Sequence, residues 1–418
     1  MADDKNFQGL RYFEVSFDAD GHLSDDGGLP AAVNAGGVQD VFFFSHGWNN
    51  SAGSARGMYE DMFGGLAGLL GDKLATSVAV GIFWPSLLFP EDDPQTPDTP
   101  STGAQLAAAL APAFPTQHAD LKRIGDLLDT QPQDAADLEE FHTLAKGLVT
   151  TPPLAEEDSG EAGAMDANTA AVFGHAASMS KLPPNAAQGV GNPFTALWHG
   201  GREVLRTLSY YEMKNRAGVV GRNGLGPLIA SLNPTPRVHL MGHSFGARLV
   251  SFALTGLPKD GTSPVKTLYL VQGAFSHFAF AAPMPIDHSR SGALADFRAR
   301  VDGPMLATFS VHDRAVGWWY PAASMLKHED SQGADDLTYR WGGMGHDGFQ
   351  MADTVSVPLS AVQHPYNFES GKTYLLDSNS IIAANQSAFS GAHSDIRHPE
   401  VLWALASAAG TAGTSGTA

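Results

Sequence analysis

The sequence predicts an α/β fold with a mostly parallel central sheet and flanking helices. Two observations lead to this prediction. Short apolar runs end at a glycine, a proline or a polar turn, and segments with helical periodicity lie between them. Apolar runs of this length are typical of strands that are buried on both faces, and their alternation with helices is typical of an α/β domain.

Seven segments have the character of strands. One of them, residues 9–21, alternates apolar and polar side chains and ends at the turn-prone pair Asp20-Gly21, so we expect an edge strand there. The other six are short apolar runs that predict buried strands. They lie at residues 40–47, 76–84, 236–244, 265–274, 303–313 and 372–378.

Helical periodicity appears between and after these strands. After Gly201, apolar residues recur on one helical face, and a second apolar helix is predicted from Phe245 onward. A last helix is predicted over residues 399–409. Strand and helix therefore alternate as the fold class requires.

The segment between the two halves of this pattern differs in composition. Residues 86–199 begin acidic and proline-rich and end small and polar, with three stretches of helical spacing between. We expect a core formed by residues 1–85 and 200–408, interrupted by a helical cap on flexible stems that lies over the sheet edge like a lid. The alternative is an insertion that is exposed to solvent and does not act as a lid. The three stretches of helical spacing in the insertion are residues 102–114, 118–128 and 134–148.

Residues 409–418 are low in complexity and are expected to be a disordered tail.

Composition argues against several classes of function. The formal charge of −19 would repel a phosphate backbone, so nucleic-acid binding is not expected. The chain has no cysteine for a disulfide, a thiolate nucleophile or a cysteine-ligated zinc ion. No apolar run reaches the roughly 20 residues of a transmembrane helix, and the amino-terminal residues do not resemble a signal peptide. These features together favour a cytoplasmic location.

The pattern Gly242-His243-Ser244-Phe245-Gly246 lies where a predicted strand changes to a predicted helix. A nucleophilic serine in a Gly-x-Ser-x-Gly turn needs that placement, because the sharp turn exposes its hydroxyl and only glycine fits beside the neighbouring backbone. The helix amino terminus also favours developing negative charge. The alternative is a glycine-rich bend whose serine only caps the helix.

With this turn in place, residues 40–84 and about 201–405 resemble an α/β-hydrolase of the serine esterase or lipase type. The resemblance implies an α/β-hydrolase fold and a serine, an acid and a histidine in that chain order. It also implies an oxyanion hole that is formed in part by the loop after an earlier strand. The intervening insertion is not covered by the resemblance.

The resemblance places the oxyanion loop at His46-Gly47-Trp48, which ends an apolar strand. The implied donors are the backbone N–H groups of Trp48 and Phe245, and Gly47 lets the backbone turn toward the substrate oxygen. The alternative is an ordinary His-Gly turn.

The acid implied by the resemblance is Asp313, which closes a late strand. An ion pair between Asp313 and its neighbour Arg314 at the surface is the alternative. Asp347 and Asp377 are the substitutes for the acid.

The histidine is chosen among the 16 in the chain. His393 follows the last predicted strand and precedes the last helix, as the family order requires. His346 lies in a glycine-rich loop before that strand and is the alternative base. His398 stands at a helix start and is expected to cap or pack.

The sequence thus predicts a carboxylic-ester hydrolase that works through an acyl-enzyme on Ser244. An amidase or a thioesterase with the same three residues, or a noncatalytic binding or effector protein that keeps the fold, are the alternatives. The expected partner is a small-molecule or lipid-like ester. The mechanism needs no cofactor, and we predict no metal site, because the spacing of the His-Asp pairs matches no zinc pattern. The sequence does not specify an oligomeric state.

Overall fold

The computed structural model describes most of the core and part of the insertion. Much of residues 86–199 and residues 411–418 of the predicted tail lie outside the described residues. The described residues are 5–86, 89, 102–152, 168–170, 172–173, 197–198, 200–259, 261–319, 342–385 and 390–410.

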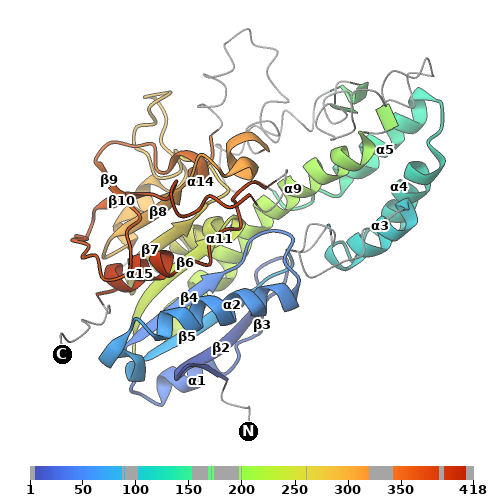
Figure 1. Ribbon diagram of the computed structural model, residues 1–418. Helices are drawn as coiled ribbons and strands as arrows, with labels where there is room; N and C mark the ends of the chain where they lie inside the picture. The colour runs from blue at the N-terminus through green and yellow to red at the C-terminus, as the bar shows by residue number, and fades with distance from the viewer. Residues whose placement is uncertain are drawn as a thin grey trace.

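Ten strands of the described chain form one mixed sheet in the order β1-β2-β5-β4-β6-β7-β8-β10-β9, with β3 paired to β2 (Figure 1). The pairs β1–β2 and β2–β3 are antiparallel, and all the others are parallel. The predicted α/β class with a mostly parallel sheet is therefore confirmed. The strands are β1 (Asn6–Phe7), β2 (Leu10–Phe17), β3 (Leu23–Asp25), β4 (Asp40–Ser45), β5 (Ser77–Phe83), β6 (Arg237–His243), β7 (Val265–Val271), β8 (Met305–Phe309), β9 (Thr354–Pro358) and β10 (Thr373–Asp377).

All six apolar runs form strands, but the two edges of the sheet differ from expectation. The predicted edge strand, β2, lies one place inside, because the two-residue β1 pairs with its outer side and β5 pairs with it in parallel. At the other edge, β9 was not predicted. Its five residues are only partly buried or exposed, so they lack the apolar run that marks the other parallel strands.

Strand β4 shows how the sheet divides the core. Successive side chains of a strand point to opposite faces. Val41 and Phe43 accordingly belong to one apolar cluster, and Phe42 and Phe44 belong to the other. All four are at most 1% exposed, which explains why this strand is a continuous apolar run.

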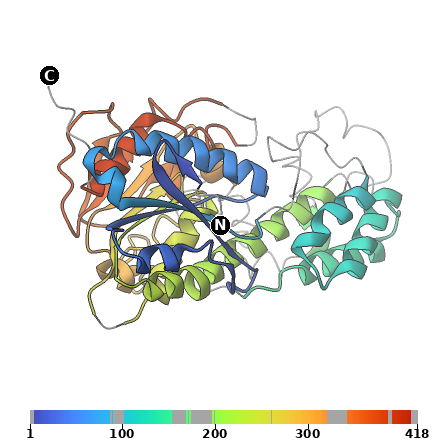
Figure 2. The same ribbon diagram turned by 90° about the horizontal axis from the view of Figure 1, so that it is seen from below.

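Helices cover both faces of the sheet, as Figure 2 shows from below. Helices α2 (Ala52–Ala67) and α15 (Pro399–Ala408) pack on the face of Phe42 and Phe44, whereas α1 (Leu29–Asn34), α9 (Gly201–Val220) and α11 (Phe245–Ala253) pack on the other face. Helix α2 was not predicted. Shorter helical segments are η1 (Gly71–Thr76), η3 (Ala111–Ala113), η6 (Gly221–Leu225), α10 (Gly226–Ser231), η7 (Leu254–Gly256), η8 (Ala295–Arg300), η9 (Ala315–Trp319) and α14 (Met344–Asp347).

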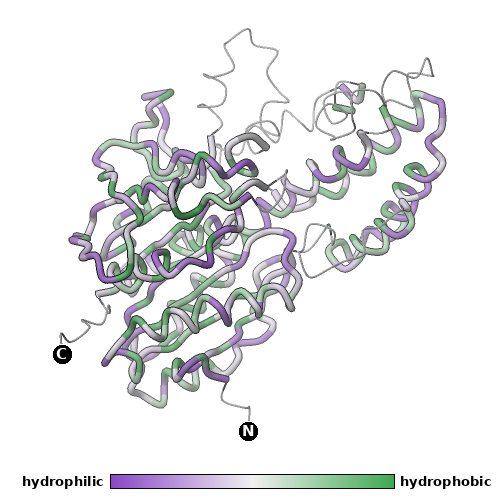
Figure 3. The backbone as a smooth tube through the Cα atoms, in the orientation of Figure 1, coloured by the Kyte–Doolittle hydropathy of each residue, from purple (hydrophilic) through white to green (hydrophobic). Residues whose placement is uncertain are grey.

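The three stretches of helical spacing in the insertion contain α3 (Gly103–Leu110), α4 (His118–Thr130) and α5 (Ala135–Gly147). We call α3, α4 and α5 the arm. The arm lies beside the amino-terminal half of α9, to one side of the sheet (Figure 1). Its inward residues Leu106, Ile124 and Phe141 belong to the same apolar cluster as Leu208 of α9. Apolar and polar residues alternate along these helices (Figure 3), which is the pattern expected of helices that bury one face.

A buried ion pair on α9 binds the backbone around the arm. The carboxylate of Glu212 accepts the backbone N–H groups of residues 150–151, and Arg216 Nη2 donates to Glu212 Oε1 at 3.0 Å. Arg216 also donates to the backbone carbonyls of Pro85 and Ala113, each at 3.1 Å. The two side chains are 1% and 3% exposed. One pair therefore fixes the chain at three points around the arm.

Candidate active site

Ser244 is the single residue between β6, which ends at His243, and α11, which begins at Phe245. Its backbone has φ 57° and ψ −124°, a conformation that is rarely adopted by a residue with a side chain. The backbone is held on both sides, because Ser244 N–H donates to the carbonyl of Val271 and Ala274 N–H donates to the carbonyl of Ser244, each at 3.2 Å.

The two glycines of the turn are required by close backbone contacts. A Cβ atom on Gly242 would lie 2.3 Å from the carbonyl oxygen of Gly246, and one on Gly246 would lie 2.1 Å from the carbonyl oxygen of Ser45. Any larger residue would force the strand and the helix apart. The glycines therefore let α11 start directly beside the carboxyl ends of β4 and β6.

His393 connects Ser244 to Asp313. His393 Nε2 lies 2.8 Å from Ser244 Oγ, and His393 Nδ1 lies 2.7 Å from Asp313 Oδ2. A neutral imidazole that donates from Nδ1 to a carboxylate has an acceptor at Nε2, so it can receive the hydroxyl proton of Ser244. The three side chains form a hydrogen-bonded chain that joins β6, the loop after β8 and the loop before α15.

Two loops pair to bring His393 and Asp313 together. Asp313 forms an isolated antiparallel bridge with Gly391, and Ala392 N–H donates to the carbonyl of His312 at 2.9 Å. Gly391 has φ 59°, and a Cβ atom there would lie 2.3 Å from the same carbonyl oxygen. Glycine at this position therefore allows the close approach of the two loops.

The carboxylate of Asp313 is fully buried and accepts hydrogen bonds on both oxygens. Val316 N–H donates to Oδ1 at 3.0 Å, and Gln272 Nε2 donates to Oδ2 at 2.9 Å, beside the imidazole of His393. A buried charge is tolerated when it is hydrogen-bonded in this way. Gln272 was not predicted as a site residue.

His243 holds the backbone of His393. Its Nε2 donates to the carbonyl oxygen of His393 at 2.9 Å, and the two rings lie 4.9 Å apart. Burial, with a contribution from the nearby imidazole of His393, lowers the pKa of His243 to about 3. His243 is therefore neutral near pH 7 and acts as a donor to a carbonyl, a contact that its place in the Gly-x-Ser-x-Gly pattern did not predict.

The predicted oxyanion loop contacts the serine. A Cβ atom on Gly47 would lie 2.6 Å from Ser244 Cβ, so the loop passes as close to Ser244 as a glycine permits. His46 is buried, which lowers its pKa to about 4, and its Nδ1 donates to the carbonyl of Gly47 at 2.9 Å. Its ring stacks on Trp84 at 5.8 Å. These contacts fix the turn that precedes Trp48.

The side chain of Trp48 packs beside the first residue of α11. The Trp48 ring lies 6.1 Å from that of Phe245 and 5.8 Å from that of Tyr210. Phe245 is the first residue of α11, where a backbone N–H has no acceptor within the helix. Of the two residues whose N–H groups were predicted as oxyanion donors, Phe245 directly follows Ser244, and Trp48 directly follows Gly47, which lies against the side chain of Ser244.

The alternative residues lie outside the chain Ser244–His393–Asp313. His346 Nδ1 is 2.6 Å from Asp347 Oδ1, and this contact raises the pKa of His346. Burial alone would raise the pKa of Asp347, but its contacts with His277 and His346 lower it. Asp377 is exposed and accepts from the backbone and side chain of Asn379. Among the described residues, none of the three alternatives forms a hydrogen bond with Ser244 or His393.

Comparison with known proteins gave no match. No family model, no curated protein and no solved structure matches the chain. Among the described residues, no helix combines the length and the apolar composition needed to cross a membrane.

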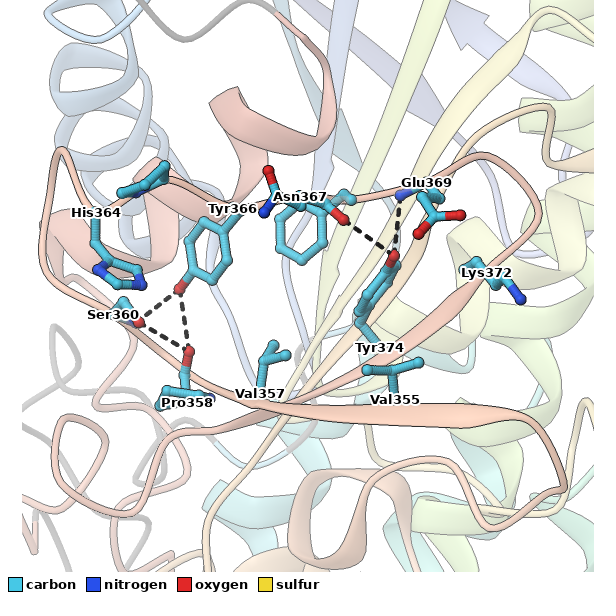
Figure 4. A pocket seen from close by; sticks show the side chains of 12 residues that line it. Val355, Val357, Pro358, Ser360, His364, Tyr366, Asn367, Glu369, Lys372 and Tyr374 are labelled. Atoms are coloured by element: carbon cyan, nitrogen blue, oxygen red, sulfur yellow. Dashed lines mark hydrogen bonds between the residues drawn. The ribbon is translucent and has the colours of Figure 1, made fainter.

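A concavity of about 410 Å³ lies beside β10 and the edge strand β9 (Figure 4). The hydroxyl groups of Tyr366 and Tyr374, which line it, accept the backbone N–H groups of Ser360 and Glu369 and so brace the loop above the strands. None of the three residues of the hydrogen-bonded chain lines this concavity. It is a separate surface feature.

Three exposed side chains, Asp18, Asp20 and His22, lie close enough together to hold a metal ion. Asp18 already accepts the backbone N–H groups of Asp20 and His22 and contacts the ring of His22 at 3.0 Å. These bonds are those of an ordinary polar turn, and the cluster is remote in the sheet order from β6.

Proposed function

We propose that the protein is a serine hydrolase of the α/β-hydrolase type that cleaves carboxylic esters through an acyl-enzyme on Ser244. The observation that carries the proposal is the distance of 2.8 Å between His393 Nε2 and Ser244 Oγ, together with 2.7 Å between His393 Nδ1 and Asp313 Oδ2. These are the separations at which a nucleophile, a base and an orienting acid work as one unit.

A serine hydroxyl is too weak an acid to ionise near neutral pH, so the base must take its proton during attack. In the proposed first step, Ser244 Oγ bonds to the ester carbonyl carbon while its proton passes to His393 Nε2. Asp313 holds the imidazole by Nδ1 and stabilises its charged form. The tetrahedral intermediate collapses, and His393 gives the proton to the alkoxide that leaves.

The second step repeats the chemistry with water. His393 takes a proton from a water molecule, the hydroxide bonds to the acyl carbon, and the bond to Ser244 Oγ breaks with return of the proton to the serine. The backbone N–H groups of Trp48 and Phe245 are the proposed donors to the oxyanion in both steps. The close contact of Gly47 with Ser244 supports this role, because the loop lies against the serine side chain to which the acyl carbon would bond.

The backbone of Ser244 also supports the proposal. A strained conformation at a single residue with a side chain persists only where the surrounding structure enforces it, and such residues cluster at active sites. Here the flanking hydrogen bonds to Val271 and Ala274 and the packing of Gly242 and Gly246 enforce it. A residue that only capped the helix would not require φ 57°.

A fluorophosphonate probe tests the proposal, because it modifies serines that are activated by a base. We expect the wild-type protein to be labelled and the Ser244→Ala variant to remain unlabelled. Equal labelling of both would remove Ser244 from the mechanism, and no labelling of either would favour a noncatalytic binding protein. A panel of esters, thioesters and amides then separates an esterase from a thioesterase or an amidase.

A further inference from the structure

Gln272 is a fully buried residue directly after β7. It has φ 46°, the left-handed region that is uncommon for residues other than glycine. Its chain neighbours are those that bond to Ser244, since Val271 accepts the N–H of Ser244 and Ala274 donates to its carbonyl. The segment that fixes the backbone of the serine therefore also carries Gln272.

The side-chain amide of Gln272 uses both of its donor hydrogens and accepts one hydrogen bond. Nε2 donates to Asp313 Oδ2 and to the carbonyl of Gly345, each at 2.9 Å. Oε1 accepts the hydroxyl of Thr308 at 2.9 Å. Because the hydroxyl and the amide oxygen face each other, the amide group is held with its two N–H bonds directed at Asp313 and Gly345.

Oxygen Oδ2 of Asp313 receives both this amide and the imidazole of His393, at 2.9 and 2.7 Å. Val316 N–H binds the other oxygen. A carboxylate with donors on both oxygens cannot rotate without losing one of them. The donor of Gln272 also places the positive end of an N–H dipole beside the carboxylate, which reduces the negative potential at the imidazole.

We propose that Gln272 is a positioning residue that orients Asp313 toward His393 and limits the negative charge that the imidazole experiences. The inference rests on the proposed function, since it assigns His393 the role of base. The amide touches neither Ser244 nor a substrate and acts through Asp313. Sequence reasoning did not find it, because Gln272 and Asp313 are 41 positions apart.

Two variants separate orientation from charge. Gln272→Met keeps the approximate shape and removes the donor, whereas Gln272→Glu adds a second carboxylate beside Asp313. Greater negative charge near an imidazole favours its protonated form. We therefore expect the pH at half-maximal rate of fluorophosphonate labelling to increase from wild type to Gln272→Met and further to Gln272→Glu. The titratable groups that also face this pair are His243 from β6 and His346 from α14, and both are unchanged in the variants.

At its optimal pH, Gln272→Met should be labelled roughly tenfold to a hundredfold more slowly than the wild-type protein. This is the effect expected for loss of a hydrogen bond to a charged group. Gln350→Met is the matched control. Its amide also donates to a backbone carbonyl, that of Asp347 at 2.9 Å, but it has no contact with Asp313 among the described residues. The control should keep the wild-type rate and pH profile.

A readout without activity is the low-field proton resonance of the His393 Nδ1–H···Asp313 hydrogen bond, identified by its loss in His393→Ala. We expect it to shift in Gln272→Met and to stay unchanged in Gln350→Met. If Gln272→Met does not fold, Thr308→Val replaces it, because this variant removes the hydroxyl that orients the amide.

The inference is overturned if Gln272→Met, or Thr308→Val in its place, keeps the wild-type rate, pH profile and resonance. A lower rate with an unmoved pH profile and an unmoved resonance also overturns it, since that result indicates only a packing role. If the wild-type protein is not labelled at all, the serine-hydrolase proposal fails, and the resonance alone decides whether Gln272 orients Asp313.

Discussion

The imidazole of His393 lies 2.8 Å from the hydroxyl oxygen of Ser244, although 149 positions separate the two residues in the chain. The parallel sheet makes this contact possible, because the carboxyl ends of β6, β7 and β8 lie at one edge. Loops that leave this edge can meet over it, as they do at ligand sites of other open α/β sheets.

The choice between the two candidate histidines can be tested by replacing each separately. We expect His393→Ala to lower kcat/KM for a short nitrophenyl ester by roughly a thousandfold or more, because the nucleophile loses its base. His346→Ala should change it less than tenfold, since His346 contacts Asp347 instead. Abolition of hydrolysis only by His346→Ala would assign the base to that residue.

The backbone of Ser244 predicts a difference between two inactive variants. Both Ser244→Ala and Ser244→Gly lack the hydroxyl, but only glycine adopts φ 57° and ψ −124° without strain. After allowance for the greater flexibility of glycine in the unfolded chain, we expect Ser244→Gly to be the more stable by roughly 1 kcal/mol. Urea unfolding of the two proteins measures this difference. A less stable glycine variant would show that the turn stores no strain.

Buried histidines predict loss of stability in mild acid. Burial lowers the pKa of His46 from 6.5 to about 4, so the folded protein binds fewer protons than the unfolded chain between these values. The free energy of unfolding is therefore highest above pH 6.5. It falls by about 1.4 kcal/mol per pH unit for each such histidine as the pH drops toward 4. His46→Asn should lower the slope of the unfolding free energy against pH by about 1.4 kcal/mol per pH unit, because the unfolded variant takes up one proton fewer. Equal slopes for the two proteins between pH 6 and 5 would contradict the prediction.

The buried pair on α9 predicts a large effect of charge removal. Glu212→Gln leaves Arg216 buried without its counterion and should lower the free energy of unfolding by about 3–5 kcal/mol. The double variant Glu212→Gln/Arg216→Met should be more stable than the single variant, because no uncompensated charge remains. Glu140→Gln, which breaks the exposed pair with Arg123, is the control and should have little effect. Equal effects of Glu212→Gln and Glu140→Gln in urea unfolding would contradict the prediction.

The features that could be predicted from the sequence are those that a local pattern of residues encodes. The turn at Ser244 was predictable because a strand signal, two glycines and an apolar helix occur in succession, and β6 and α11 meet there. Asp313 and His393 were predictable as candidates from chain order after the resemblance had been recognised. Their distances from each other could not be predicted, because the pairing of Gly391 with Asp313 depends on two loops far apart in sequence.

Other features had no local signal. Gln272 is a single polar residue after an apolar strand, and nothing around it indicates that its amide faces a carboxylate from another loop. Glu212 and Arg216 look like an ordinary (i, i+4) pair on a helix surface, and nothing in that spacing indicates that both side chains are buried and bonded to backbone groups far away in the chain. Strand β9 was missed because its side chains are too exposed to form an apolar run.

The bonds of Glu212 and Arg216 limit how the arm can be engineered. A shortcut that joined β5 directly to α9 would remove the backbone partners of the ion pair at Pro85, Ala113 and residues 150–151, and it would expose to water apolar residues of α9, such as Leu208, that pack against the arm. Grafting a foreign cap would meet the same obstacle. The arm therefore cannot be exchanged without redesign of α9, and its excision would need polar replacements of the apolar residues that it covers before an altered ester preference could be ascribed to its loss.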